Sequence, residues 1–326
     1  MLKTISITLR VITGLALLCA AAIRIGFPGT PREVEQKHAE FRMANWVAPV
    51  YAQGDDWNRD WSWDWSGDMP IHEQETIRKT YTLSGAGRSL DIDNVFGSIE
   101  VVGRDGDQVQ LVVNKTLRAE SNEKLEQARK NITLDVTQEG SALRIVVNGP
   151  FRKERDDFWG FRDEPGYFAI MDFQLQVPRE IALTLKTVGQ GGVRVRDING
   201  DFSIHDVSGG IELENVAGSG TARTVNGAIR ARFRENPRAN CDFGSINGSV
   251  DLSFAPKLNA DFRLHTFNGS ISSDFAMTDN TPEVEHEGLR TIYRANRLSG
   301  GRVGTGGPEI SVKTLNGAIR ILENHE

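Results

Sequence analysis

The residues of this sequence that could do chemistry are not grouped into a catalytic or metal-binding motif. No histidine is spaced from a second histidine or from a cysteine as zinc ligands are. No Gly-x-Ser-x-Gly elbow, phosphate loop or His-Glu-x-x-His sequence occurs. The histidines are His38, His72, His205, His265, His286 and His325. These observations predict a protein that is not an enzyme and that needs no metal or cofactor.

Arginines give the strongest argument for a substrate site. Five of them would form a basic stripe on the outer face of a sheet, as in polysaccharide lyases built on a β-helix. Glu212 and Glu214 interrupt this stripe, and a ladder of opposite charges explains the same residues without a substrate. A lyase-like enzyme acting on acidic polysaccharide is therefore the third interpretation of the function. The five residues are Arg194, Arg196, Arg230, Arg232 and Arg234.

Calcium and thiol chemistry are not favoured either. Asp197, Asp206 and Asn215 stand at turns, but the second and third glycines of the calcium-binding Gly-Gly-x-Gly-x-Asp unit are missing. Cys241 is expected to be a small buried side chain. Because the other cysteine, Cys19, lies in the N-terminal apolar segment, no internal disulfide is expected.

An acidic segment rich in tryptophan is the strongest candidate for a contact surface. It contains Trp57, Trp61, Trp63 and Trp65, of which the last three share one face of an extended strand. These side chains could stack on sugars or anchor a partner protein. They could also pack on the protein's own surface, which is the favoured interpretation because large apolar surfaces are rarely left bare.

A nine-residue repeat determines where these residues lie. Apolar residues stand two, four and seven positions after each repeated glycine, and positions two and four share one face of a strand. The third apolar residue, such as Ile246 or Phe267, is also expected to face inward. Each glycine marks a corner that needs positive φ or a close backbone approach. The predicted corner glycines are Gly191, Gly200, Gly209, Gly218, Gly227, Gly248, Gly269 and Gly317.

The repeat predicts an all-β protein whose core is a β-solenoid of short nine-residue strand units, similar to a right-handed single-stranded β-helix. An antiparallel meander is the alternative, because Asn-Gly between two apolar strands is a strong hairpin signal. Charges favour the solenoid, since Arg194, Glu212 and Arg230 alternate in sign at intervals of eighteen residues. Two units should therefore form one coil, with opposite charges stacked on its outer face. A second such series is Arg196, Glu214 and Arg232.

Four regions can be assigned along the chain. Residues 1–23 form a signal peptide or an N-terminal anchor, since basic residues precede a short apolar run. Residues 24–70 form a linker with the tryptophan-rich segment, and residues 71–180 form strands with one capping helix. Residues 181–323 form the repeat region, which has an excursion at 277–307 and longer coils of 21 residues after Gly227. The protein is expected to be exported to the periplasm or the cell surface.

Two stretches and one repeated unit carry a resemblance to a known family. They are LDIDNVFGSIEVVG, FQLQVPREIALTLKTVG and the repeated T-x-NG-x-I units. In these segments the chain resembles the bacterial "putative adhesin" domain family of unknown function and is similar to the adhesin-head GIN domains. The resemblance spans roughly residues 75–323. It implies an exported protein of repeated short strands and brings no catalytic residues with it.

The function expected from the sequence is a non-enzymatic, adhesin-like binding or scaffold surface in the cell envelope, with a protein or glycan partner. An envelope signalling protein that acts through a protein partner is the alternative. The formal net charge of −6 disfavours nucleic acid as a partner. Contact with the membrane is expected only through residues 1–23, if they are retained.

Overall fold

The computed structural model describes residues 69–152, 166–189, 191–279, 285–287, 290–292 and 298–324, which belong to one compact unit, residues 65–326. In these ranges the regular structure is two large β-sheets, a small hairpin, one α-helix and one 3₁₀ turn. The expectation of an all-β protein is confirmed. No helix in the described ranges is long and apolar enough to cross a membrane. The N-terminal apolar segment and the tryptophan-rich segment lie outside them.

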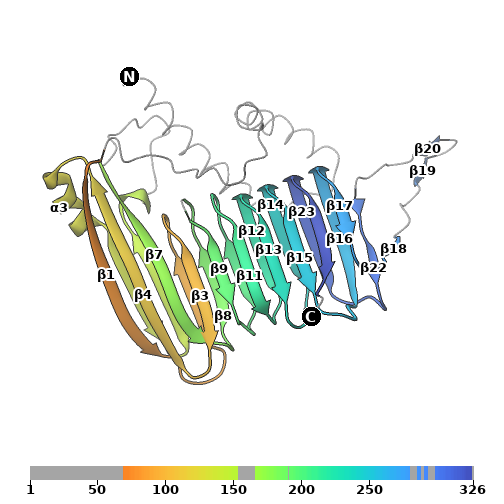
Figure 1. Ribbon diagram of the computed structural model, residues 1–326, viewed down its shortest axis with the longest axis horizontal. Coiled ribbons are helices and arrows are strands. Elements are labelled where there is room, and N and C mark those ends of the chain that lie inside the picture. Colours follow the sequence, from red (N-terminus) through yellow and green to blue (C-terminus); the bar gives the residue numbers. More distant parts are fainter. Residues whose placement is uncertain are drawn as a thin grey trace. The chain divides into compact units, whose positions relative to one another are not determined.

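The first sheet has ten strands, in the order β1-β4-β7-β3-β9-β11-β13-β15-β24-β17 (Figure 1). β1, β4 and β7 pair antiparallel, and every later pair is parallel. The strands are β1 (Ile71–Thr82), β3 (Ile99–Arg104), β4 (Gln108–Ala119), β7 (Tyr167–Pro178), β9 (Val193–Arg196), β11 (Ile211–Val216), β13 (Ile229–Phe233), β15 (Val250–Phe254), β17 (Ile271–Ser273) and β24 (Ile319–Glu323).

The second sheet has twelve strands, in the order β18-β22-β16-β23-β14-β12-β10-β8-β2-β6-β5, with β21 also beside β16. Pairing is parallel from β16 to β6 and antiparallel at both ends. The strands are β2 (Ser89–Asp93), β5 (Thr133–Glu139), β6 (Ala142–Asn148), β8 (Ala182–Lys186), β10 (Phe202–His205), β12 (Gly220–Asn226), β14 (Cys241–Asn247), β16 (Ala260–Asn268), β18 (Thr278–Asp279), β21 (Leu298–Ser299), β22 (Gly301–Val303) and β23 (Glu309–Asn316). A separate hairpin joins β19 (Glu285–Glu287) to β20 (Arg290–Ile292).

Successive strands from β8 to β17 alternate between the two sheets, and from β8 to β15 strands two apart in the chain are neighbours. Ile211 pairs with Val193 on one side and with Ile229 on the other, so residues eighteen apart in sequence lie side by side. The prediction that two nine-residue units are needed before the chain returns to the same sheet is therefore confirmed. The interval rises to 21 where Ile229 pairs with Val250, as the glycine spacing predicted.

The last two strands depart from sequence order. β23 lies between β14 and β16, and β24 lies between β15 and β17, as the darkest blue strand in Figure 1 shows. Thr314 pairs with Ser245 on one side and with Thr266 on the other. Because the repeated units carry the same residues at the same positions, the register is satisfied in either order, and sequence intervals alone do not reveal this insertion.

A close backbone approach makes glycine necessary at the ends of the units. A Cβ on Gly227 would lie 2.1 Å from the carbonyl oxygen of Gly209, and one on Gly248 would lie 2.0 Å from that of Gly227. Neither distance is possible between real atoms, so a side chain there would push neighbouring strands apart. Of the eight glycines predicted at corners, only Gly191 has a positive φ, of 138°.

Buried hydroxyl groups tie the two sheets together beside these glycines. Thr224 Oγ1 donates a hydrogen bond of 2.8 Å to the Gly209 carbonyl oxygen, and Ser245 Oγ donates one of 2.9 Å to the Gly227 carbonyl oxygen. The same bond recurs from Thr187 to Gly97, from Thr266 to Gly317 and from Thr314 to Gly248. The threonine of the T-x-NG unit therefore satisfies a backbone carbonyl that the β-ladder leaves open.

The asparagine of the same unit forms a ladder that crosses the ends of neighbouring strands. Each side-chain amide donates to the next amide oxygen: Asn247 to Asn226 at 2.7 Å, Asn316 to Asn247 at 2.8 Å and Asn268 to Asn316 at 2.9 Å. Stacked amides of this kind need strands that are parallel and in register. The T-x-NG unit thus makes two kinds of hydrogen bond: its threonine bonds to a glycine carbonyl, and its asparagine bonds to the asparagine of the next strand.

The third apolar residue of the repeat does not always face inward. Ile198 and Val216 are 1% and 2% exposed, as predicted. In the units that end with T-x-NG, however, the buried hydroxyl takes the inward position, and the next residue faces outward. Phe267 is therefore 51% exposed, and Ile246 is half-buried. The predicted inward position of these two residues is wrong, because the strand must turn its hydroxyl toward the glycine carbonyl.

One helix packs at the antiparallel end of the first sheet. α3 (Asn122–Asn131) begins after Ser121, whose hydroxyl accepts a hydrogen bond of 3.2 Å from the Lys124 amide. Its buried residues Leu125 and Ala128 face β4 and β7. α3 agrees with the expectation of one helix within residues 71–180, and its serine is a favourable N-cap residue. A 3₁₀ turn, η3 (Pro150–Arg152), follows β6.

Candidate functional site

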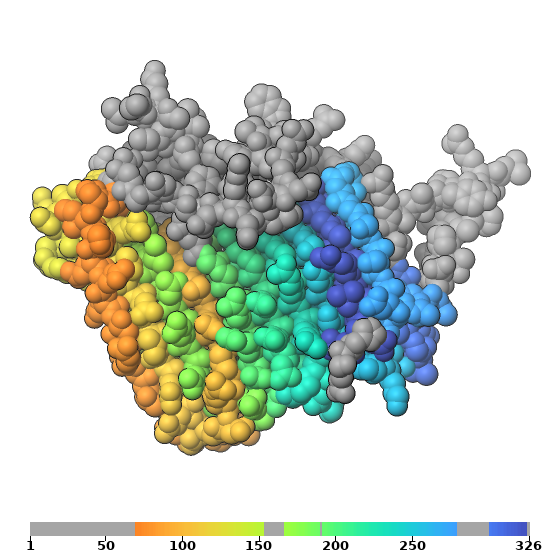
Figure 2. Space-filling view, in the orientation of Figure 1, coloured from red at the N-terminus to blue at the C-terminus, as the bar shows by residue number. Residues whose placement is uncertain are grey.

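The outer face of the first sheet carries a row of alternating charges, and this face is visible in Figure 2. Six neighbouring strands each contribute one residue, and every residue lies directly beside the next. We call this set the charge ladder: Glu100, Arg194, Glu212, Arg230, Asp251 and Arg320. Each favourable cross-strand pair contributes about 0.2–1 kcal/mol to pairing.

Ion pairs within the charge ladder are close. Arg194 Nε lies 2.8 Å from Glu212 Oε2, and Arg320 Nε lies 2.6 Å from Asp251 Oδ1. The Glu212 carboxylate raises the pKa of Arg194, and the Asp251 carboxylate does the same for Arg320. These arginines hold strands together, which accounts for part of the basic stripe without a substrate.

The second predicted series is only partly present. Glu214 lies beside Arg196, but the register of β11 and β13 shifts between Leu213 and Val216. Glu214 is therefore not placed beside Arg232, and the prediction of a second complete ladder is wrong. Arg196 instead pairs with Glu100 in β3.

The outer face of the second sheet carries a row of a different kind. One position in each of six neighbouring strands is basic or glycine, and these residues again lie directly side by side. We call this set the basic row: Lys186, His205, Arg223, Gly244, Lys313 and His265. Beyond Lys186 the next residue is Asp93, whose carboxylate lies 2.9 Å from Arg152. The sign of the charge does not alternate along the basic row.

Electrostatics within the basic row are visible at His205. Burial lowers the pKa of His205, and the positive charges of Arg223 and Lys186 lower it further. This imidazole is therefore neutral at pH 7. Its Nδ1 and the Nδ1 of His265 are buried without a hydrogen-bond partner in the described part of the chain. Arg223 is compensated on one side, where its Nε lies 2.9 Å from Asp242 Oδ1.

An apolar row runs beside the basic row. It stands two residues later on each strand, so it lies on the same outer face. Its exposure increases along the sheet, from 7% at Val225 to 51% at Phe267. We call this set the apolar row: Val225, Ile246, Leu315 and Phe267. Together the two rows give the second sheet an amphipathic outer strip.

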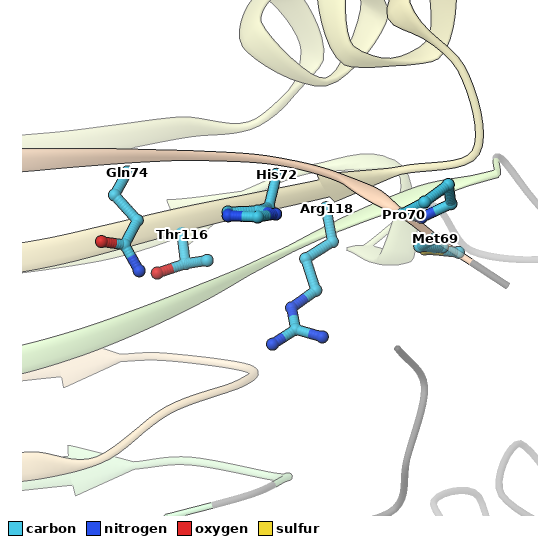
Figure 3. A pocket seen from close by; sticks show the side chains of 6 residues that line it. All are labelled: Met69, Pro70, His72, Gln74, Thr116 and Arg118. Atoms are coloured by element: carbon cyan, nitrogen blue, oxygen red, sulfur yellow. The ribbon is translucent and has the colours of Figure 1, made fainter. Parts of the chain in front are cut away.

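A shallow hollow of about 300 Å³ lies on the outer face of β1 and β4 (Figure 3). His72 faces Arg118 and Gln74 faces Thr116 across the two strands. Arg118 Nε has no accessible surface and no hydrogen-bond partner among the described residues. The lining is completed by Met69 and Pro70. An arginine beside an amide and a hydroxyl could hold one carboxylate. No pattern in the sequence predicts that His72 and Arg118, which are 46 residues apart, face each other here.

Asp206 is the most perturbed acid in the described part of the chain. It is fully buried, at the inward position where neighbouring units carry threonine. Its Oδ1 accepts hydrogen bonds of 2.6 Å from the Val207 amide and 3.2 Å from the Ser208 amide, but Oδ2 has no partner. Burial raises the pKa of Asp206 to about 7. This carboxyl group therefore keeps its proton over much of the acidic range.

Other candidate residues are placed as follows. Trp57, Trp61, Trp63 and Trp65 lie outside the described residues, so their proposed contacts stay predictions. Cys241 is buried, and its thiol pKa is raised mainly by desolvation. No cluster of three or more metal-ligating side chains occurs in the described ranges. His205 and His265 lie on an outer face and are half-buried.

No protein-family model and no curated protein matches this chain. Solved structures with a similar arrangement include a "putative cell adhesion protein" from Clostridium sporogenes, at 10% identity and a TM-score of 0.41, covering 77% of this chain and 100% of that one. A "putative adhesin" from Bacteroides fragilis has 12% identity and a TM-score of 0.25, covering 77% and 97%. A "putative lipid binding protein" from Parabacteroides distasonis has 13% identity and a TM-score of 0.27, covering 76% and 96%.

Two of these structures carry names of the same kind as the adhesin-like family that the sequence resembles. At such identities and scores the likeness says nothing about the ligand of this chain. The ligand must be argued from its own residues.

Proposed function

We propose that this protein is an exported right-handed β-solenoid that serves as an adhesin-like, non-enzymatic binding or scaffold surface in the cell envelope. The alternation of strands between two parallel sheets supports the solenoid. The basic residues before the N-terminal apolar run support export to the periplasm or the cell surface. The eight repeated glycines would be its corners.

The observation that carries the proposal is the regularity of both outer faces. On each face one residue per strand lies beside the next, alternating in sign on the first sheet and basic or glycine on the second, at a spacing of about 4.8 Å. Such a row spreads its contacts along a line, whereas catalysis needs unlike groups converging on one point. Such rows suit binding to an extended partner.

The tryptophan-rich segment favours the alternative, an envelope protein that acts through a protein partner. Four tryptophans within nine residues provide the side chains that most often dominate protein interfaces. Replacement of Trp61 and Trp63 by alanine tests this idea. Loss of partner binding at an unchanged melting temperature supports a contact role, and a sharp drop in melting temperature with unchanged binding contradicts it.

Export and binding can be tested separately with the full chain. A C-terminal alkaline phosphatase fusion should be active in the periplasm, and an inactive fusion would contradict export. The secreted protein should bind components in a glycan array or in an envelope extract. Release of unsaturated sugars from acidic polysaccharide would overturn the non-enzymatic assignment and favour the lyase.

A further inference from the structure

The two outer faces of this protein differ in how charged residues are arranged across neighbouring strands. On the first sheet, the charge ladder alternates in sign across six strands, so every charge has an opposite neighbour. On the second sheet, no member of the basic row is acidic. The alternation neutralises the charge ladder from within, and the basic row has no such alternation.

The electrostatic environment of the row is positive at its centre. Burial lowers the pKa of His205, and the charges of Arg223 and Lys186 lower it further. Asp242 pairs with Arg223 from the next strand, and Lys186 lies beside Asp93, which also pairs with Arg152. An anionic ligand lying along the row would meet basic side chains and no acidic member of the row.

The shape of the row restricts the ligand. Neighbouring strands lie about 4.8 Å apart, so the basic positions on six strands form a line of about 24 Å from the first to the last. A line of this length fits a linear polymer better than a small anion. Gly244 leaves an open place in the middle: a Cβ there would meet only Arg223 Cγ at 3.6 Å and the Lys313 carbonyl oxygen at 3.9 Å.

The neighbouring row restricts it further. Side chains of the apolar row lie beside the cations and offer a surface to carbon-bound hydrogens. A sugar ring presents such hydrogens on its face and can carry a carboxylate at its edge. Single-stranded nucleic acid needs aromatic side chains on which bases stack, and the strip has one, Phe267.

We propose that the basic row and the apolar row together bind a linear acidic polysaccharide that crosses the strands of the second sheet. Its carboxylates would lie against Lys186, Arg223 and Lys313, and its ring faces against Ile246, Leu315 and Phe267. This inference rests on the proposed binding function and gives it a surface and a ligand class. It moves the acidic-glycan contact from the arginines of the first sheet to the opposite face.

The test measures binding of the full chain to polygalacturonate, with neutral dextran and single-stranded DNA as the other probes. Polygalacturonate should bind, more weakly as salt is added, because exposed charges are screened. Lys186→Gln combined with Lys313→Gln should weaken binding by about tenfold. Gly244→Asp should weaken it at least as much, since it places an anion in the middle of the row.

Two exposed arginines of the first sheet provide the matched control. Arg78→Gln combined with Arg232→Gln removes the same charge from the opposite face and should leave binding unchanged. An equal loss in both double variants would overturn the proposal, as would DNA binding that matches polygalacturonate. Absence of polygalacturonate binding in a protein that still binds another envelope component would overturn this inference alone. Circular dichroism of each variant checks that the fold is intact.

Discussion

Replacement of Asp206 by asparagine should stabilise the protein, and the gain should increase with pH. Asp206 occupies the buried position at which Thr187 and Thr224, in the neighbouring strands, donate to a glycine carbonyl oxygen. An ionised carboxylate cannot donate, and Asp206 Oδ2 is buried without a partner. Asn94, one strand further along, shows how asparagine fits: its Oδ1 accepts from the Val95 amide at 2.8 Å, and its Nδ2 donates to the Gly97 carbonyl at 3.2 Å.

The magnitude follows from the pKa of Asp206, which burial raises from 3.8 to about 7. Below pH 3.8 the folded and unfolded chains both bind the proton, and there is no penalty. As pH rises toward 7, only the unfolded chain releases the proton, so the stability of the folded chain falls. Above pH 7 the penalty levels off at about 4 kcal/mol, and at pH 4 it is less than about 1 kcal/mol.

Urea unfolding followed by circular dichroism, at several values between pH 4 and pH 8, measures this difference between Asp206→Asn and the natural protein. Other acids are common to both chains and cancel. As the pH rises, the free energy of unfolding of the natural protein should fall relative to that of the variant, and most of the fall should lie between pH 3.8 and about pH 7. A difference that does not change with pH, or a variant that is less stable at pH 8, would refute the assignment of a protonated carboxyl group.

Four other substitutions test the strand arrangement in the same unfolding assay. Gly227→Ala should lower the free energy of unfolding by about 3 kcal/mol, because the new Cβ meets a backbone oxygen. In the matched control, Gly244→Ala, the new Cβ meets no atom closer than 3.6 Å, so this variant should be neutral or slightly more stable. Equal effects of the two substitutions would contradict the close approach at Gly227. Asn247→Ala breaks the amide ladder on both sides and should cost about 1–3 kcal/mol, and an unchanged midpoint would show that the ladder contributes nothing. Glu212→Lys places three cations in a row and should cost about 1 kcal/mol at low salt and less in about 1 M salt; a loss that is independent of salt would argue against an electrostatic ladder.

The register of the strands could be predicted because the charges of outward residues alternate at the same interval at which the strands pair. Arg194, Glu212 and Arg230 alternate at eighteen residues, and only strands that pair at that interval make the alternation useful. The extension of the ladder to Glu100 and Arg320 could not be predicted. Glu100 belongs to an irregular region, and Arg320 reaches its place only because β24 inserts between β15 and β17.

The basic row was missed for a related reason. Lys186 precedes the regular glycine spacing, and Lys313 stands in β23, whose place depends on the same insertion. The outward position of Phe267 was missed because hydrophobicity alone does not show that a neighbouring threonine has a stronger reason to be buried. Its hydroxyl satisfies the Gly317 carbonyl, and the alternation of the strand then turns Phe267 outward. Intervals in a repeat thus predict neighbours, but hydrogen-bonding needs decide which residue faces the core.

The parallel coil itself is tested most directly by disulfide formation between chosen strands, with both natural cysteines replaced by serine. Ser203 in β10 lies directly beside Thr221 in β12, so Ser203→Cys and Thr221→Cys should form a disulfide on mild oxidation. In an antiparallel meander, β10 would pair with the next strand, β11, and Ser203 would lie opposite a residue such as Glu212. The solenoid predicts a crosslink for the first pair and none for Ser203→Cys with Glu212→Cys. The reverse result would contradict it.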